Sequence, residues 1–218
     1  MDVSLATIVL WAVPVVFAIT LHEAAHGYVA KLFGDQTAWM LGRVTANPLK
    51  HMDPVGTILV PGMLVAIAAF THVPAFIFGW AKPVPVNFGN LRNPKRDMFW
   101  VAGAGPFANF LMAIAWGILL KAVAPGGLFP SSGLMEMAGA GIQINLMLLA
   151  LNLLPILPLD GGRIAVSVLP HSLAAGYARL EPYGFMVVIL LLATGILSDL
   201  MRPILRGAEY ILALILGL

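Results

Sequence analysis

Residues 5–33 form an almost unbroken apolar run that contains the pattern His-Glu-x-x-His. As one α-helix the run would be about 43 Å long, more than the roughly 30 Å thickness of the hydrocarbon core of a membrane. One end must therefore emerge from the bilayer, and His22 lies about 26 Å along the helix, near the far boundary. Because no basic segment precedes the run, we interpret it as a membrane span and not as a cleaved signal peptide.

The pattern itself points to a metal site. His22 and His26 lie on one face of a helix, because residues four apart stand one above the other, and two such imidazoles can bind one zinc ion. Glu23 then lies beside the metal without binding it, where its carboxylate can take a proton from water, as in metalloproteases. The alternative is a polar helix end that faces lipid headgroups. Ionisable groups inside a membrane segment favour the functional interpretation.

Composition places the rest of the chain in a membrane as well. Of 218 residues, 60% are hydrophobic and 10% are charged, with a mean hydropathy of +0.93, which excludes an ordinary soluble domain. The formal charge of +2 is too small to indicate a nucleic-acid partner. Because the chain has no cysteine, a thiolate zinc site is excluded, and any metal must be bound by histidine and carboxylate.

We predict an all-α polytopic membrane protein with about five to six membrane segments. The apolar segments after the first are residues 55–80, 98–123, 134–157, 183–200 and 203–218, the last of which is short for a crossing. Residues 37–48 and 81–87 contain β-prone and turn residues, which predicts short extended pieces near the cytoplasmic face. We expect one domain over residues 1–218, with a catalytic core at about 5–163 and C-terminal membrane segments at about 183–218.

A third metal ligand is needed, because a catalytic zinc ion typically takes three protein ligands and keeps one position open. His51 and Asp53 could bind a metal, but beside two prolines a turn-forming role is favoured. His72 and His171 have no partner pattern, and we interpret both as structural. Asp160 is the best candidate, although an Asp-Gly pair alone is a common turn signal. It follows a long apolar span loosened by prolines, and the two glycines after it allow a close approach of the backbone.

Together these motifs resemble the site-2 protease family of intramembrane zinc metalloproteases, in its compact bacterial or archaeal branch without accessory domains. The matching elements occur in the expected order over about residues 5–163: His22-Glu23-x-x-His26, residues 47–54, residues 79–87, Ala102-Gly103-Ala104-Gly105-Pro106-Phe107-Ala108-Asn109, and Asn152-x-x-Pro155-x-x-Pro158-x-Asp160-Gly161.

The resemblance implies a role for each matching residue. His22, His26 and Asp160 would bind the zinc ion, and Glu23 would be the general base. Asn152 would lie near the substrate carbonyl, where its amide can hold the carbonyl or steady the oxyanion. Asn109 matches another asparagine of the family, and a hydrogen bond between helices is an equal interpretation of that residue.

A shared metal also constrains the topology. His22 and Asp160 lie near the C-terminal ends of their spans, so the first span and residues 134–157 must run in the same direction. Residues 55–80 must then enter and leave the membrane on one side, as a re-entrant stretch. The basic residues on that side are Lys31, Arg43, Lys50, Lys82, Arg92, Lys95 and Arg96, which the positive-inside rule makes cytoplasmic. Arg202 and Arg206, between the last two segments, fit this count less well.

We therefore expect a multi-pass protein of the plasma or inner membrane, with its active site near the cytoplasmic side. It would be a zinc endopeptidase with one Zn²⁺ per chain, and its partners would be the lipid bilayer and a transmembrane protein or peptide that it cleaves in or near the membrane. The substrate must be locally unwound, because a helix hides its carbonyls, and Pro83, Pro85 and their neighbours could offer a strand edge to it. The alternatives are an inactive relative that binds membrane proteins and a metal-binding transporter. An intact Glu23 and Asn152 favour the enzyme.

Overall fold

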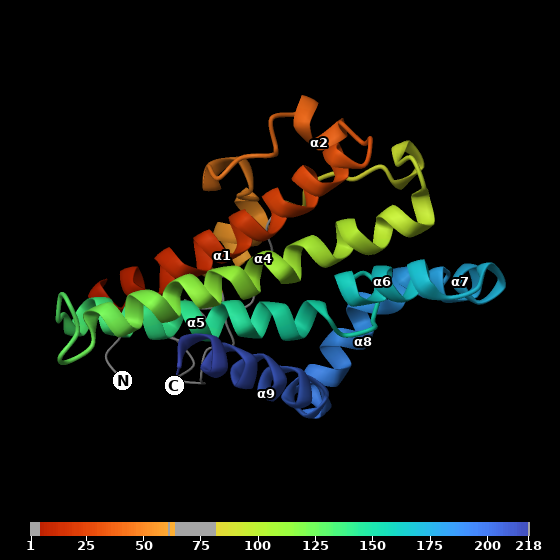
Figure 1. The fold of residues 1–218 in the computed structure, drawn as a ribbon. Coiled ribbons are helices and arrows are strands. Elements are labelled where there is room, and N and C mark those ends of the chain that lie inside the picture. Colours follow the sequence, from red (N-terminus) through yellow and green to blue (C-terminus); the bar gives the residue numbers. More distant parts are fainter. Residues whose placement is uncertain (1–4, 61, 64–81, 218) are drawn as a thin grey trace.

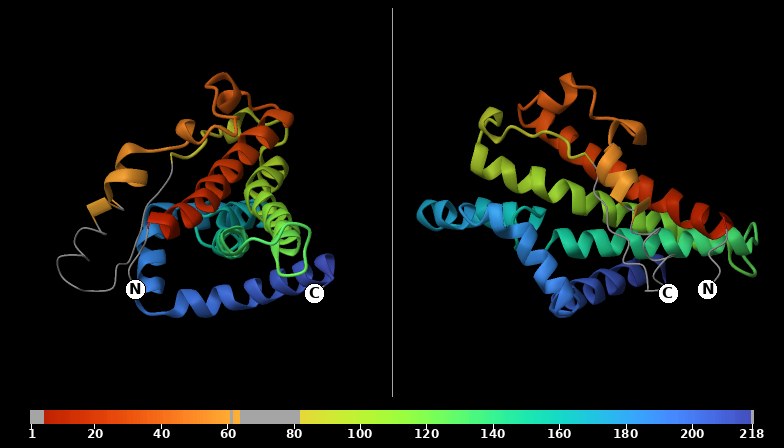
Figure 2. Two further views of the ribbon diagram at one scale, coloured as in Figure 1. Left: turned by 90° about the vertical axis from the view of Figure 1, so that its left-hand side faces the viewer. Right: turned by 180° about the vertical axis from the view of Figure 1, so that it is seen from behind.

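Three long helices make up the framework of the protein. The structure, a computed structural model, describes residues 5–60, 62–63 and 82–217. Helices α1 (Leu5–Leu32), α4 (Pro94–Val123) and α5 (Ser132–Asn152) lie side by side (Figures 1 and 2). α1 and α5 run in the same direction and α4 runs in the opposite one (Figure 1). The C-terminal ends of α1 and α5 therefore meet the N-terminal end of α4 at one end of the molecule.

Shorter elements surround this framework. They are α2 (Thr37–Met40), the 3-10 helices η1 (Pro48–Lys50) and η3 (Phe88–Asn90), the π-helix η2 (Pro54–Leu59), α6 (Asp160–Val168), α7 (His171–Ala178), α8 (Glu181–Ala193) and α9 (Ile196–Leu216). By length and composition α4 and α5 can each cross a membrane, and α7 with α8, bent by 66°, would count as a third span if taken together. The described part of the chain thus has two to three candidate spans, and it contains no strand.

The extended piece predicted for residues 37–48 is wrong at its start, where α2 forms. Just before α2, the carboxylate of Asp35 accepts hydrogen bonds from the backbone N–H of Thr37 at 3.1 Å and from its hydroxyl at 2.5 Å, an Asx turn that leads into the helix. Residues 82–87, the second predicted piece, form neither a helix nor a strand.

The same carboxylate joins the end of α1 to the chain that leads into α4. Asp35 is fully buried and also accepts hydrogen bonds from the backbone N–H of Asn87 at 2.7 Å and the side-chain amide of Asn90 at 3.2 Å. Burial acts to raise the pKa of Asp35, but the hydrogen bonds from Thr37, Asn87 and Asn90 outweigh it, so the pKa lies below its ordinary value. The ionised form of Asp35 is therefore part of the fold.

Residues 51 and 82, which flank the segment predicted to be re-entrant, lie next to each other. The backbone N–H of Lys82 donates to the carbonyl oxygen of His51 at 2.9 Å. Ten residues further on, the N–H of Arg92 donates to the carbonyl oxygen of Phe33 at 3.0 Å, at the end of α1. Both ends of the stretch thus lie at the same end of the framework. The predicted re-entrant course of residues 55–80 itself falls mostly outside the described residues.

The C-terminal helices differ from the prediction in where they break. Gly195, with a φ of +78°, lies between α8 and α9, and α9 continues through Pro203. α9 packs one face on α4 and α5 with Leu197, Met201, Ala208, Leu212 and Leu216. Arg202 and Arg206 therefore belong to a helix and not to a connection, and Arg202 forms an exposed ion pair with Asp199 at 3.0 Å.

Candidate metal centre

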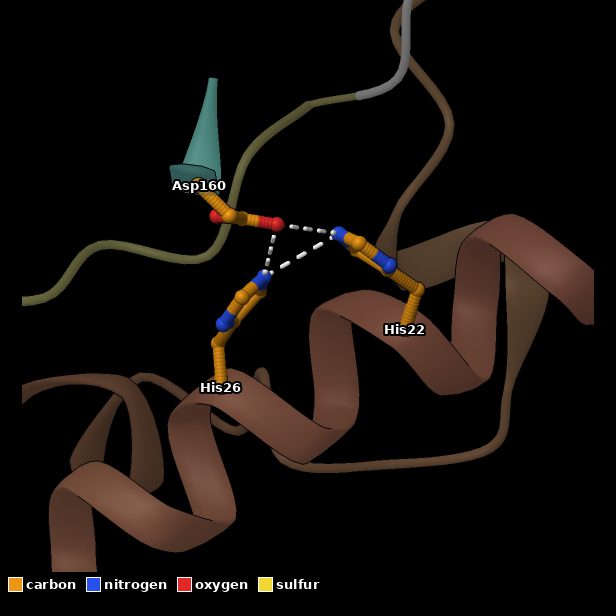
Figure 3. A group of neighbouring side chains, drawn as sticks. All are labelled: His22, His26 and Asp160. Atoms are coloured by element: carbon orange, nitrogen blue, oxygen red, sulfur yellow. Dashed lines mark hydrogen bonds and ion pairs between the residues drawn. The ribbon is translucent and has the colours of Figure 1, made fainter. Parts of the chain in front are cut away.

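Three side chains that lie far apart in the sequence meet beside α4. His22 and His26 lie one turn apart on α1, Asp160 begins α6, and all three point toward one another (Figure 3). Oδ2 of Asp160 lies 3.2 Å from Nε2 of His22 and 3.3 Å from Nε2 of His26, and the two Nε2 atoms are 3.0 Å apart. Both imidazoles are buried. The structure therefore brings the three sequence-predicted metal ligands together.

The separations fit a metal ion of the size and geometry of zinc. Zinc binds imidazole nitrogen and carboxylate oxygen at about 2.0–2.2 Å, so two ligands of a tetrahedral ion lie roughly 3.3–3.5 Å apart. The two distances to Asp160, 3.2 and 3.3 Å, are close to this edge length, and the distance between the imidazoles, 3.0 Å, is shorter. Two neutral nitrogens and one carboxylate also form the donor set of known catalytic zinc sites, with one position left open.

The hydrogen bonds behind the imidazoles leave the electron pairs of the Nε2 atoms free to face the point between the three ligand atoms. Nδ1 of His26 lies 2.7 Å from the carbonyl oxygen of Val101, which can only accept, so Nδ1 carries the proton and Nε2 has a free electron pair. Nδ1 of His22 lies 2.6 Å from Oδ1 of Asn109. Oδ2 of Asp160 is buried and has no hydrogen-bond donor among the described residues. Three such atoms close together form a group that can hold a cation.

α4 can support the imidazoles because residue 105 is glycine. A Cβ at Gly105 would lie 2.4 Å from Nε2 of His26 and 2.6 Å from Nε2 of His22. Val101, Gly105 and Asn109 are spaced four apart and so form one stripe of α4, which faces the metal ligands.

A tight turn brings Asp160 to the same place. α5 ends at Asn152 and α6 starts at Asp160, so the carboxylate lies at the positive end of a helix. A Cβ at Gly161 would lie 2.3 Å from the carbonyl oxygen of Leu154, which confirms the close backbone approach predicted from the glycine pair.

Glu23 is held apart from the ligands by a backbone group. Its Oε2 accepts a hydrogen bond from the N–H of Val84 at 2.7 Å, while Oε1 has no partner among the described residues. Residue 27, one turn further along α1, is glycine, and a Cβ there would lie 2.9 Å from the side chain of Val44 and 3.0 Å from that of Val84. Residues 82–87 can therefore approach α1 closely enough to fix the carboxylate.

The other sequence candidates lie outside the three-residue group. Asn152 is in the last turn of α5, where its amide donates to the carbonyl oxygen of Leu148 at 3.0 Å. His51 bonds to the carbonyl oxygen of Thr45 at 3.0 Å, and Asp53 caps η2, so their predicted turn-forming roles are confirmed. His171 is exposed at the start of α7, and His72 lies outside the described residues.

Several groups that support the site were not singled out from the sequence. The contributions of Val84 and Val101 are backbone groups, which leave no side-chain signal. Gly105 appeared only as part of a small-residue motif. Asn145 is a buried amide in an apolar span, and the cost of placing such a group in a membrane could have identified it.

The fold and the site together define a helical protein of membrane type in which two histidines and one carboxylate can hold a metal ion. No family model and no solved structure matches the chain. Among curated proteins, "Putative zinc metalloprotease YwhC" of Bacillus subtilis is 39% identical over 207 residues, which is 93% of this chain and 89% of that protein. "Putative zinc metalloprotease Rip2" of Mycolicibacterium smegmatis is 30% identical over 83% of this chain and 65% of its own length. "Zinc metalloprotease Rip1" of Mycobacterium tuberculosis is 36% identical over a shorter stretch, 28% of this chain and 19% of that protein.

The chain belongs to the site-2 protease family of zinc metalloproteases. Zinc is the metal that the names of these relatives imply, and the group of His22, His26 and Asp160 agrees with it. The apolar helices and the family together indicate association with a membrane.

Proposed function

We propose that the protein is a zinc endopeptidase that cleaves transmembrane or juxtamembrane segments of other membrane proteins. The observation that carries this proposal is the convergence of Nε2 of His22, Nε2 of His26 and Oδ2 of Asp160 within 3.3 Å of one another, beside a glutamate that binds none of them. One zinc ion per chain would be held by these three atoms. When bound, zinc acts as a Lewis acid that polarises water and carbonyl groups.

Glu23 is the general base in this proposal. The bond from Val84 holds Oε2, so the proton would be taken at Oε1 and later passed to the leaving amine. A metal carrier has no use for a carboxylate held next to the ligands but not among them. Asn152 is half-buried in the last turn of α5. Its side-chain amide would give up the hydrogen bond to the carbonyl oxygen of Leu148 and donate to the substrate carbonyl instead.

The substrate would reach the site as an unwound segment. A helical substrate keeps its carbonyls in hydrogen bonds, so a stretch near the scissile bond must be extended before attack. Residues 82–87 are neither helix nor strand and lie against Glu23, which supports the proposal that Pro83, Pro85 and their neighbours guide such a segment.

The proposed topology is multi-pass, with five to six membrane segments and the metal centre near the cytoplasmic side of the plasma or inner membrane. Two observations support it. α1 and α5 run in the same direction, as two spans that share a metal must, and the hydrogen bond between Lys82 and His51 keeps Lys50 and Lys82 at one end of the framework. The N-terminus would then lie on the outer side.

Four variants test the ligands and the base separately. Elemental analysis of purified wild-type protein should give about one zinc per chain, and His22→Ala, His26→Ala and Asp160→Ala should each lose most of it. Glu23→Gln should keep its zinc but lose cleavage of a membrane-embedded reporter in liposomes by about 10²- to 10⁴-fold. Full zinc retention in Asp160→Ala would remove that residue from the site. Undiminished cleavage by Glu23→Gln would refute the mechanism.

A further inference from the structure

Two asparagines lie buried between the framework helices, directly behind His22. Asn109 of α4 and Asn145 of α5 are both 0% exposed. Nδ2 of Asn109 donates to Oδ1 of Asn145 at 3.0 Å, and Oδ1 of Asn109 lies 2.6 Å from Nδ1 of His22. Buried amides among apolar helices are costly unless their polar atoms are paired, and these form a continuous chain of hydrogen bonds that ends at a metal ligand.

The direction of this chain is fixed by backbone carbonyls, which can only accept. Nδ2 of Asn145 donates to the carbonyl oxygen of Gly141 at 2.8 Å, so Oδ1 of Asn145 is the atom that faces Asn109. Nδ2 of Asn109 donates both to that oxygen and to the carbonyl oxygen of Ala18 at 3.3 Å. Oδ1 of Asn109 must therefore face His22, and Nδ1 of His22 must donate to it.

The consequence is that Nε2 of His22 carries the free electron pair. Without the acceptor behind it, the ring would have a competing arrangement, with the proton on Nε2 and a hydrogen bond to Oδ2 of Asp160 only 3.2 Å away. That arrangement would occupy two of the three metal-binding atoms with one proton. His26 has no such dependence on a side chain, because its Nδ1 donates to the backbone carbonyl of Val101.

We propose that Asn109 and Asn145 are positioning residues that hold His22 in the tautomer able to bind metal. Asn109 accepts a hydrogen bond from the imidazole of His22. Asn145 prevents the amide of Asn109 from turning its NH₂ group toward that imidazole. The proposal rests on the zinc site of the proposed function and adds two residues behind it. It differs from a mere bond between helices, because that role would not require a particular tautomer of His22.

The test uses full-length variants in detergent. Asn109→Leu, which has a similar volume and no acceptor, should lower zinc affinity by about 10- to 100-fold, the usual effect of losing a hydrogen-bond partner behind a ligand. Asn109→Asp keeps an acceptor for Nδ1 but loses the donor to Oδ1 of Asn145, so it should lose less zinc affinity than Asn109→Leu. Asn145→Leu should lie between the two. Gln143→Leu, an exposed amide on the same helix, is the matched control and should leave the affinity unchanged.

A second measurement reads the tautomer itself in metal-free protein. With ¹⁵N-labelled histidine, of which the chain has five, the spectrum of His22 should show a protonated Nδ1 in wild type and Asn109→Asp, and a protonated Nε2 in Asn109→Leu. The same tautomer in wild type and Asn109→Leu would overturn the proposal. Equal losses of zinc affinity in Asn109→Asp and Asn109→Leu would also overturn it and favour helix packing. If wild type binds no zinc, the proposed function fails, and the tautomer still decides the positioning role.

Discussion

Gly105→Ala adds one methyl group at the point where α4 meets the metal ligands, and we expect it to abolish zinc binding. The new Cβ would lie 2.4 Å from Nε2 of His26 and 2.5 Å from Cε1 of His22. Ordinary contacts of a methyl carbon are about 3.5–4.0 Å, so each ring would have to move by roughly 1 Å. Metal–ligand distances tolerate only about ±0.2 Å, so a shift of that size removes the site.

The rings have little freedom to move away. His22 is held by Asn109 at 2.6 Å and His26 by Val101 at 2.7 Å, both on the helix that carries the new methyl group. The clash can be relieved only by a displacement of α4 itself. Overpacking of this kind lowers the free energy of unfolding by about 1–3 kcal/mol. We therefore expect a protein that folds with a lower melting temperature and binds zinc at least about 100-fold more weakly.

Gly103→Ala provides the matched control. It lies on the same helix two residues earlier, and a Cβ there would meet no atom within 4 Å. The assay is titration of metal-free protein with zinc, together with thermal unfolding in detergent. If Gly105→Ala bound zinc as tightly as Gly103→Ala, the contact between α4 and the imidazoles would not exist in solution, and the assignment of the site would be refuted.

Three further outcomes follow from other contacts. Val84→Pro removes the N–H that holds Oε2 of Glu23, so zinc binding should persist while kcat falls at least about tenfold; an unchanged kcat would show that the base needs no anchor. Asp35→Asn should cost about 1–3 kcal/mol at neutral pH. Because the pKa of Asp35 is lowered by folding, its stabilisation is present above the unfolded-state pKa of about 3.9 and disappears as the pH falls through the folded-state value, so the melting temperatures of variant and wild type should converge in acid. Single cysteines at Lys50 and Arg92 should react with an impermeant reagent from one side of the membrane and a cysteine at Gly126 from the other, whereas opposite labelling of the first two would exclude the re-entrant course.

The ligand pair was predictable because a helix converts sequence spacing into geometry. His22 and His26 share a face at any place where residues 5–32 are helical, and the apolar run ensures that they are. Asp160 needed more than spacing, because its approach depends on the parallel course of α1 and α5 and on a turn that only glycine allows. The resemblance to a family and the topological argument supplied what local pattern could not.

Other features were not predictable for identifiable reasons. α2 follows a turn held by Asp35, whose carboxylate also accepts a hydrogen bond from the backbone of Asn87, far along the chain. The break before α9 lies at Gly195, while Pro203, the stronger breaker in sequence terms, is accommodated inside the helix. The anchor of Glu23 is a backbone N–H, which every residue except proline possesses, so no sequence pattern marks it.

The separation of the ligands along the chain gives the site an order of assembly. A ribosome makes His22, Glu23 and His26 before α4 and α5, and Asp160 only after them. Two imidazoles alone hold zinc weakly, so the complete set of three ligands exists only after α4 and α5 have been made. Binding of zinc by all three ligands would therefore require α1, α4 and α5 to be packed together, and would add its free energy to the folded state alone.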